Sequence, residues 1–179
     1  MQLLSHVFTR TGDDGSTYCN LLKTRVPKDH PIMELIGTLD EANSFIGLAR
    51  SFLPPYMRDI ENDLKDLQYL TFRIGFHVSG VKAVNEEDIS KLEELADKYY
   101  GLAPLKHFVL PAGTQSASAL HVARTVVRRA ERALIKAGRE FNFDDIVYKA
   151  INRLSSALFA LAVYINKVSG YPEEPVSFR

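Results

Sequence analysis

Apolar residues recur at helical spacing along most of this chain and predict five helices. Over 31–52 the residues that share one helix face are Met33, Ile36, Leu39, Ile46 and Ala49. The same period predicts further helices over 57–78, 86–100, 114–137 and 144–168. The helix over 86–100 is charged on one face and is expected to be peripheral. The predicted fold class is all-α, a five-helix bundle.

Prolines and glycines mark the ends of these helices. Asp29 is expected to cap the first helix just before Pro31, and the sequence LPPY ends that helix. The stretch GLAPLKHFVLPAGT is expected to be a connection, because it holds two prolines and two glycines. We therefore expect a single domain over 1–179, with an N-terminal segment at 1–30, a helical bundle at 31–168 and a C-terminal tail at 169–179. The tail has no helical period and is expected to wrap a surface or to fray.

Charged residues gather on one side of the predicted helix at 114–137, opposite an arc of small apolar residues. The charged arc spans about 100°. It holds His121, Arg124, Arg128, Glu131 and Arg132, with Ile135 in its middle. Such an arc is either a solvated face with helical ion pairs or a guanidinium clamp for a polyphosphate, whose oxygens suit the planar donors of arginine. The spacing alone leaves both interpretations open.

Small residues form a stripe on the first predicted helix, comprising Gly37, Asp40, Asn43, Ser44 and Gly47. Small side chains allow another helix or another subunit to approach closely, and a carboxylate buried in such a contact needs a cationic partner. The alternative is that Asp40 is simply solvated, as acidic side chains usually are.

The last predicted helix is apolar on nearly all sides, which is typical of a central helix. Asn152, Ser156 and Phe159 share one stripe of it. An amide in that position needs a hydrogen-bond partner. The partner is either a polar group of the core or a phosphate or ribose of a ligand.

The opening stretch TRTGDDGSTY, at 9–18, is rich in glycine, carboxylates and hydroxyls. Backbone N–H groups around Gly12 and Gly15, joined by threonine and serine hydroxyls, can form an anion-binding nest. The stretch lacks the GxxxxGK[ST] order of a Walker loop. An ordinary turn and a phosphate site both remain open interpretations.

Charge and cysteine content bound the function. The 22 Lys and Arg residues equal the 22 Asp and Glu residues, which disfavours general binding to nucleic acid or to an anionic membrane. Cys19 is the only cysteine, so an internal disulfide and a Cys/His metal spacing are excluded. The segment 1–30 lacks the apolar region of a signal peptide, and no run of about 18 apolar residues occurs. We expect a cytoplasmic protein with no nucleic-acid or membrane partner.

Five motifs together resemble the PduO-type ATP:cob(I)alamin adenosyltransferase family, in order and over nearly the whole chain. They are TRTGDDGSTY, PKDH, GTLDEANSFIG, HFVLPAGTQSASALHVARTVVRRAERAL and INRLSSALFALA. The resemblance implies transfer of the 5′-deoxyadenosyl group of ATP to cob(I)alamin, giving adenosylcobalamin and triphosphate. It also implies a homotrimer of five-helix bundles with ATP between subunits. The segment 1–30 then wraps the triphosphate, with Mg²⁺ bound mainly through ATP and no metal ligand from the protein.

The resemblance also implies roles for individual residues. The nucleotide contacts carried over from the family are Thr9, Arg10, Thr11, Gly12, Ser16, Thr17, Lys28, Arg128, Glu131, Arg132 and Asn152. Asp40 and Arg124 match an inter-subunit ion pair, and Phe108 matches the aromatic residue beneath the corrin. Arg128, Phe108, Asp40 and Arg124 are the expected catalytic set.

Two positions depart from the family pattern. Asp14 stands where the family usually has lysine, and Ser156 stands where it usually has aspartate. The first changes the charge near the phosphates, and the second is expected to weaken a loop or corrin contact. Partners implied by the resemblance are a reductase and an adenosylcobalamin-dependent enzyme. A rival hypothesis is a non-catalytic trimer that binds ATP and corrinoid as a carrier or sensor, and a helical structural protein is a third.

Overall fold

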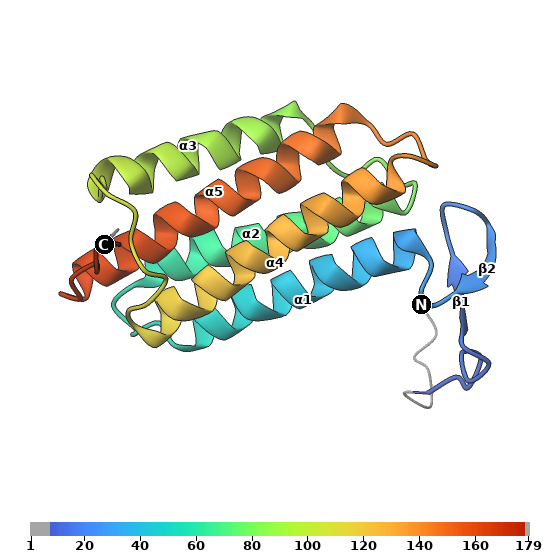
Figure 1. Cartoon of the computed structure of the whole chain (residues 1–179), viewed down its shortest axis with the longest axis horizontal. Helices are drawn as coiled ribbons and strands as arrows, with labels where there is room; N and C mark the ends of the chain where they lie inside the picture. Colours follow the sequence, from blue (N-terminus) through green and yellow to red (C-terminus); the bar gives the residue numbers. More distant parts are fainter. Residues whose placement is uncertain (1–7, 178–179) are drawn as a thin grey trace.

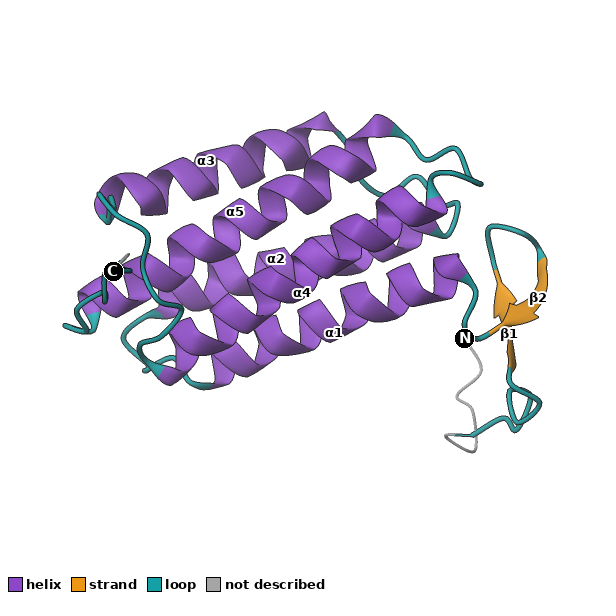
Figure 2. Cartoon of the chain, viewed as in Figure 1, coloured by secondary structure: helices purple, strands orange, loops and turns teal. Residues whose placement is uncertain are grey.

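Four long helices lie side by side and bury a common apolar core, and a fifth covers one edge (Figure 1). The computed structural model describes residues 8–177. Over that range the helices are α1 Pro31–Ser51, α2 Arg58–Val78, α3 Glu86–Leu102, α4 Gln115–Ala137 and α5 Asp145–Val168 (Figure 2). Each end lies within two residues of the boundary that the apolar period predicts. The all-α prediction is confirmed.

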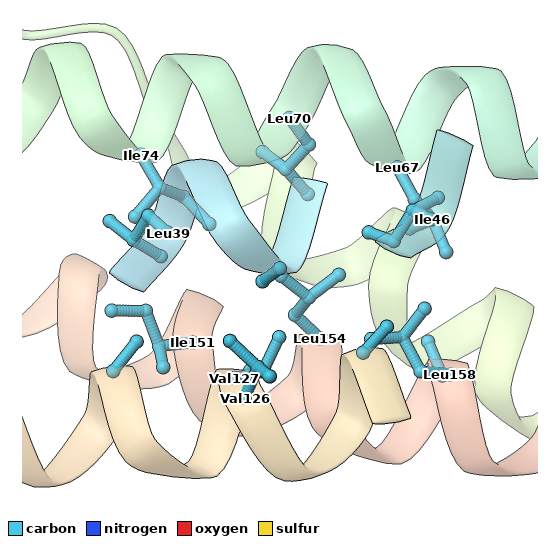
Figure 3. Close-up of a cluster of buried hydrophobic side chains, with 14 of the residues drawn as sticks. Leu39, Ile46, Leu67, Leu70, Ile74, Val126, Val127, Ile151, Leu154 and Leu158 are labelled. Carbon is cyan, nitrogen blue, oxygen red and sulfur yellow. The ribbon is translucent and has the colours of Figure 1, made fainter. Parts of the chain in front are cut away.

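The core is built around α5, which is the central helix. This helix packs against α2, α3 and α4, while α1 packs against α2 and α4. Figure 3 shows Ile151, Leu154 and Leu158 of α5 facing apolar side chains of α1, α2 and α4. By length and composition α5 could cross a membrane, but 61% of its most apolar window is buried inside the bundle. α3 packs mainly on α5, as its charged face predicts.

The first helix is capped by His30, so the prediction of Asp29 as the cap is wrong. Pro31 is the first helical residue, and the cap is the residue immediately before it. The His30 Nδ1 atom accepts a hydrogen bond from the Ile32 N–H at 3.3 Å. α4 begins in the expected way, with the Thr114 hydroxyl accepting from the Ala117 N–H at 3.2 Å.

A small antiparallel hairpin precedes the bundle, where the sequence predicts no regular structure. Its strands are β1 Ser16–Cys19 and β2 Thr24–Pro27, with Cys19 opposite Thr24. Cys19 and Val26 are buried in the apolar core, and the Asn20 side chain donates to the Ser79 carbonyl at 3.2 Å. The hairpin therefore docks on the bundle beyond the start of α1, and the loop before it points away from the helices (Figure 1).

The C-terminal tail wraps a surface, which was one of its two expected outcomes. Val109 and Pro175 form an antiparallel bridge. The Leu110 N–H donates to the Glu174 carbonyl at 2.9 Å, and the Val176 N–H donates to the Phe108 carbonyl at 2.8 Å. The tail thus pairs with the middle of the connection between α3 and α4.

Candidate functional site

A groove of about 780 Å³ lies between α3, α4, α5 and the connection that precedes α4. Its lining comprises Ala96, Asp97, Tyr100, Leu105, Lys106, His107, Phe108, Val109, Arg124, Arg128, Ser155, Ser156, Phe159 and Ala160. Aromatic and aliphatic groups thus meet two arginines in one concave surface. Such a surface suits a mostly apolar ligand that binds next to an anionic group.

Phe108 projects at this groove without being packed in the protein. Its side chain is 80% exposed, so an apolar ring is offered to solvent. Its backbone is held nonetheless, because its carbonyl accepts from the tail. Because Phe108 lines the groove, its exposed ring is available to a ligand that binds there.

Arg124 and His121 lie on α4 beside Phe159 of α5. The Arg124 guanidinium carbon is 5.8 Å from the centre of the Phe159 ring, and the His121 ring centre is 6.1 Å from it. Among residues 8–177, the Arg124 Nε and both His121 ring nitrogens are buried without a hydrogen-bond partner. Burial, followed by the nearby Arg124 charge, lowers the pKa of His121 to about 4. Burial, followed by the charge of Arg128, also lowers the pKa of Arg124.

The predicted nucleotide residues of α4 and α5 lie together. The Asn152 Nδ2 donates to the Glu131 Oε1 at 3.1 Å, and an Arg132 guanidinium N–H donates to the Arg128 carbonyl at 3.0 Å. Asn152 is exposed, so its partner is a side chain at the surface and not a core group. Within the described range, Arg128 and Arg132 form no ion pair with a carboxylate. Both guanidinium groups are therefore available to an anion.

The loop at 9–15 is shaped by two cations of the same segment. The Lys28 ammonium donates to the Gly12 carbonyl at 2.7 Å, and the Arg25 guanidinium donates to the Thr11 carbonyl. Arg10 has a φ of 61° and Gly15 a φ of 78°, so two left-handed residues turn this loop. Left-handed backbone at a non-glycine residue is costly and is common where ligands bind.

Asp14 is built into the same loop. Its Oδ1 accepts from the Ser16 N–H at 2.9 Å and from the Ser16 hydroxyl at 2.8 Å. These bonds to Ser16, followed by the nearby Arg25 charge, hold the pKa of Asp14 below its usual value. The carboxylate at this departure from the family pattern therefore fixes Arg25 in the loop.

One chain does not bring the loop and the α4 cations together. The hydrogen bonds described for Thr9, Thr11, Gly12 and Ser16 all end within residues 9–28. Lys28 belongs to the same segment, whereas Arg128, Glu131, Arg132 and Asn152 are on the bundle. Arg10 and Thr17 likewise belong to the hairpin and its loop. Asp40, on α1, is exposed and forms no ion pair with the described residues, so its predicted pairing with Arg124 does not occur within the chain.

Several residues of the site were missed by sequence reasoning. Arg25 orders the loop, but it sits on a strand that the apolar pattern does not reveal. Tyr100 and Leu105 line the groove from a helix end and a connection that carry no motif. One sequence feature did point to the groove. Phe159 shares a predicted stripe with Ser156, and both residues line the groove. No three His, Cys, Asp or Glu side chains of the described range are arranged to hold a metal ion.

Known proteins resemble this chain along almost its full length. The cobalamin adenosyltransferase family model matches residues 7–165. A corrinoid adenosyltransferase of Bacillus subtilis is 38% identical over 186 residues, which cover 97% of this chain and 95% of the relative. One from Citrobacter freundii is 36% identical over 165 residues, which cover 87% and 92% respectively.

A solved structure has the same fold. It is a variant of a PduO-type ATP:corrinoid adenosyltransferase from Lactobacillus reuteri, complexed with cobalamin and ATP. Its TM-score with this chain is 0.89 at 34% identity, and the match covers 97% of this chain and 100% of the other.

Proposed function

This chain belongs to the cobalamin adenosyltransferase family, as its motifs predict, and we propose that it transfers the 5′-deoxyadenosyl group of ATP to the cobalt of cob(I)alamin. The observation that carries the proposal is the groove that Phe108, Arg124 and Arg128 line together. An apolar wall suits the corrin, and the cationic wall suits the phosphates of the second substrate. The products are adenosylcobalamin and triphosphate.

The reaction needs no acid, base or nucleophile from the protein. The cobalt electron pair attacks C5′ of ATP, a cobalt–carbon bond forms, and the C5′–oxygen bond breaks with its electrons going to triphosphate. The protein contributes alignment of the two substrates and stabilisation of the negative charge on the leaving group. Arg128 and Arg132 supply that charge from α4, and Lys28 supplies it from the N-terminal segment.

ATP contacts come from two parts of the protein in this proposal. Thr9, Arg10, Thr11, Gly12, Ser16 and Thr17 surround the triphosphate, together with Lys28. Asn152 and Glu131 bind the nucleoside end from the bundle. Mg²⁺ would be held mainly by ATP, as Mg²⁺ commonly is at nucleotide sites, and would offset negative charge on the triphosphate.

The enzyme acts as a homotrimer with its active sites between subunits. Two features support this assembly. The loop at 9–15 points away from its own bundle, so its phosphate site lies apart from the α4 cations of the same chain (Figure 1). Asp40 is exposed, and Arg124 lines the groove, with no ion pair between either side chain and the described residues, as expected if the two pair across an interface.

Phe108 has the task of easing the reduction of Co(II). An axial ligand donates electron density to the cobalt and makes Co(II) harder to reduce, so an apolar ring in that position favours Co(I). An external one-electron reductant, supplied by a reductase, completes the step. We expect the enzyme to work in the cytoplasm and to deliver its product to an adenosylcobalamin-dependent enzyme.

One experiment tests the proposed activity. Purified protein is mixed with ATP, Mg²⁺ and chemically reduced cobalamin, and the absorption spectrum of adenosylcobalamin is followed in time. Arg128→Ala serves as the inactive comparison and Arg129→Ala as its matched control, because Arg129 pairs with Glu41 and lies outside the groove. Tight binding of both substrates without product would show a carrier or sensor instead of an enzyme.

A further inference from the structure

Adjacent residues at the end of α5 hold both ends of the connection that carries Phe108. The Lys167 ammonium donates to the Leu102 carbonyl at 2.6 Å, where α3 ends. The Asn166 Nδ2 donates to the Ala112 carbonyl at 2.9 Å, and its Oδ1 accepts from the Thr114 N–H at 3.0 Å, where α4 begins. The connection over 103–113 is therefore closed at its base by side chains from a third helix.

Asn166 is the more constrained of the two anchors. It is 0% exposed. All the hydrogen bonds described for its side-chain amide go to the connection or to the tail. Gly113 has a φ of 126°, and a Cβ built there would lie 2.1 Å from the Asn166 Oδ1. The backbone at 113 thus packs directly onto the amide, and only glycine fits both the space and the conformation.

The same amide also holds the C-terminal tail. The side-chain Nδ2 of Asn166 donates to the Glu173 Oε1 at 2.9 Å. The backbone carbonyl of Asn166 also accepts from the Tyr171 N–H at 2.9 Å. The next residues of the tail pair with the middle of the connection through Glu174 and Val176. One buried side chain consequently sets the position of two segments that meet at Phe108.

We propose that Asn166, through Glu173 and the Ala112–Thr114 backbone, is a positioning residue that holds Phe108 at the groove. It touches neither substrate. The inference rests on the role proposed above for Phe108, because its effect on the reaction passes through that ring. An unsupported connection leaves the exposed ring free to swing, and a mobile ring no longer keeps the axial position of the cobalt empty.

Two neighbouring glutamates give a matched test. Glu173→Ala removes the carboxylate to which Asn166 donates. Glu174→Ala removes a side chain but keeps the backbone carbonyl that accepts from the Leu110 N–H. Glu174 is exposed and Glu173 is half-buried in the tail, outside the apolar core, so both variants are expected to fold. Asn166→Asp adds a stronger perturbation, because its carboxylate repels Glu173 and loses the donor to the Ala112 carbonyl. Glu173→Gln in that background supplies a donor to the new carboxylate and should restore the contact with the tail only, which is a partial rescue.

The first measurement is amide hydrogen exchange, which does not depend on the reaction. Glu173→Ala should speed exchange at Leu110 and Val176 about tenfold, as expected for the loss of one charge-assisted hydrogen bond. Glu174→Ala should leave both rates unchanged. Equal exchange in Glu173→Ala and the wild-type protein overturns the inference, whatever Phe108 does.

The second measurement is turnover from two starting oxidation states. Glu173→Ala and Asn166→Asp should slow the reaction that starts from cob(II)alamin and a reductant about tenfold, and should leave the reaction from pre-formed cob(I)alamin close to wild type. The magnetic-resonance signature of four-coordinate Co(II) should weaken in parallel and return in part in the Asn166→Asp, Glu173→Gln double variant.

Phe108→Ala, run in parallel, separates the two possible failures. If Phe108→Ala loses the Co(II) signature while Glu173→Ala and Asn166→Asp keep it, the positioning role is wrong and the role of Phe108 stands. If all three variants keep the signature and the turnover, the role proposed for Phe108 is itself wrong, and the inference falls with it.

Discussion

The Asn152 amide on α5 donates to the Glu131 carboxylate on α4 across 3.1 Å, at the surface of the bundle and beside two arginines that have no carboxylate partner in the described chain. The carboxylate thus orients the amide, whose oxygen faces away from Glu131 and accepts from other donors. Arg153 is the one described donor to that oxygen, at 3.3 Å. At the proposed ATP site, a nucleotide would meet an amide already fixed in direction beside the guanidinium groups of α4.

Arg128→Ala should reduce adenosyl transfer by about a hundredfold or more while leaving the fold and the proposed trimer intact. The side chain is exposed and lines the groove, so its removal costs charge stabilisation and little packing. Initial rates with reduced cobalamin, together with circular dichroism, test this. Asn152→Ala should behave in the same way, and near-native rates in both variants would exclude the proposed nucleotide contacts.

Asp40→Ala should weaken assembly rather than chemistry alone. An arginine buried at an interface without its partner costs about 3 to 5 kcal/mol. Sedimentation and thermal melting measure this cost, and Glu41→Ala is the control, since Glu41 pairs with Arg129 at the surface, where a pair contributes about 1 kcal/mol or less. Identical melting and assembly in Asp40→Ala and Glu41→Ala would place Asp40 in solvent.

Phe108→Ala should retain ATP affinity and alkylate pre-formed cob(I)alamin better than it handles cob(II)alamin with a reductant. A loss of about 3 kcal/mol of barrier stabilisation slows turnover by about a hundredfold. Phe72→Ala, which removes another exposed aromatic ring from α2, is the matched control. Equal turnover from both oxidation states in Phe108→Ala would reduce the ring to an ordinary surface residue.

His121 should make the protein less stable as the pH falls. Its pKa of about 4 in the folded state lies below the ordinary histidine value, so the unfolded chain binds a proton that the folded protein does not. Between pH 7 and pH 5 this difference removes about 2 kcal/mol of unfolding free energy. His121→Phe, compared with the wild type by denaturant titration at both pH values, should lose less stability by that amount. The exposed His107→Phe is the control, and equal pH dependence in His121→Phe and wild type would contradict the assignment.

The helices could be predicted from the sequence because each buries a long, periodic apolar face. In α5, Ile151, Leu154 and Leu158 repeat at helical spacing and all lie in the core. The hairpin could not be predicted in the same way, because its strands are four residues long and are stabilised by docking Cys19 and Val26 on the bundle. A short strand whose support comes from elsewhere in the chain has no period of its own.

The candidate site likewise contains residues that the sequence pattern groups and residues that it does not. Arg128, Glu131 and Arg132 could be grouped by helical spacing alone, since they share a face of α4. Asn166 could not be singled out, because its partners at Ala112 and Glu173 belong to a connection and a tail. Contacts between a helix and two irregular segments depend on the finished fold, so only the structure reveals them.

Cys19 is the only thiol in the sequence, and it lies fully buried on the strand by which the hairpin docks. A buried thiol reacts with a soluble disulfide reagent only while its surroundings are open. The rate of that reaction therefore reports the equilibrium between docked and undocked hairpin without any introduced label. If ATP binds the proposed loop and stabilises the docked hairpin, added ATP should slow this reaction. The modification rate of Cys19 then measures how strongly ATP stabilises the docked state.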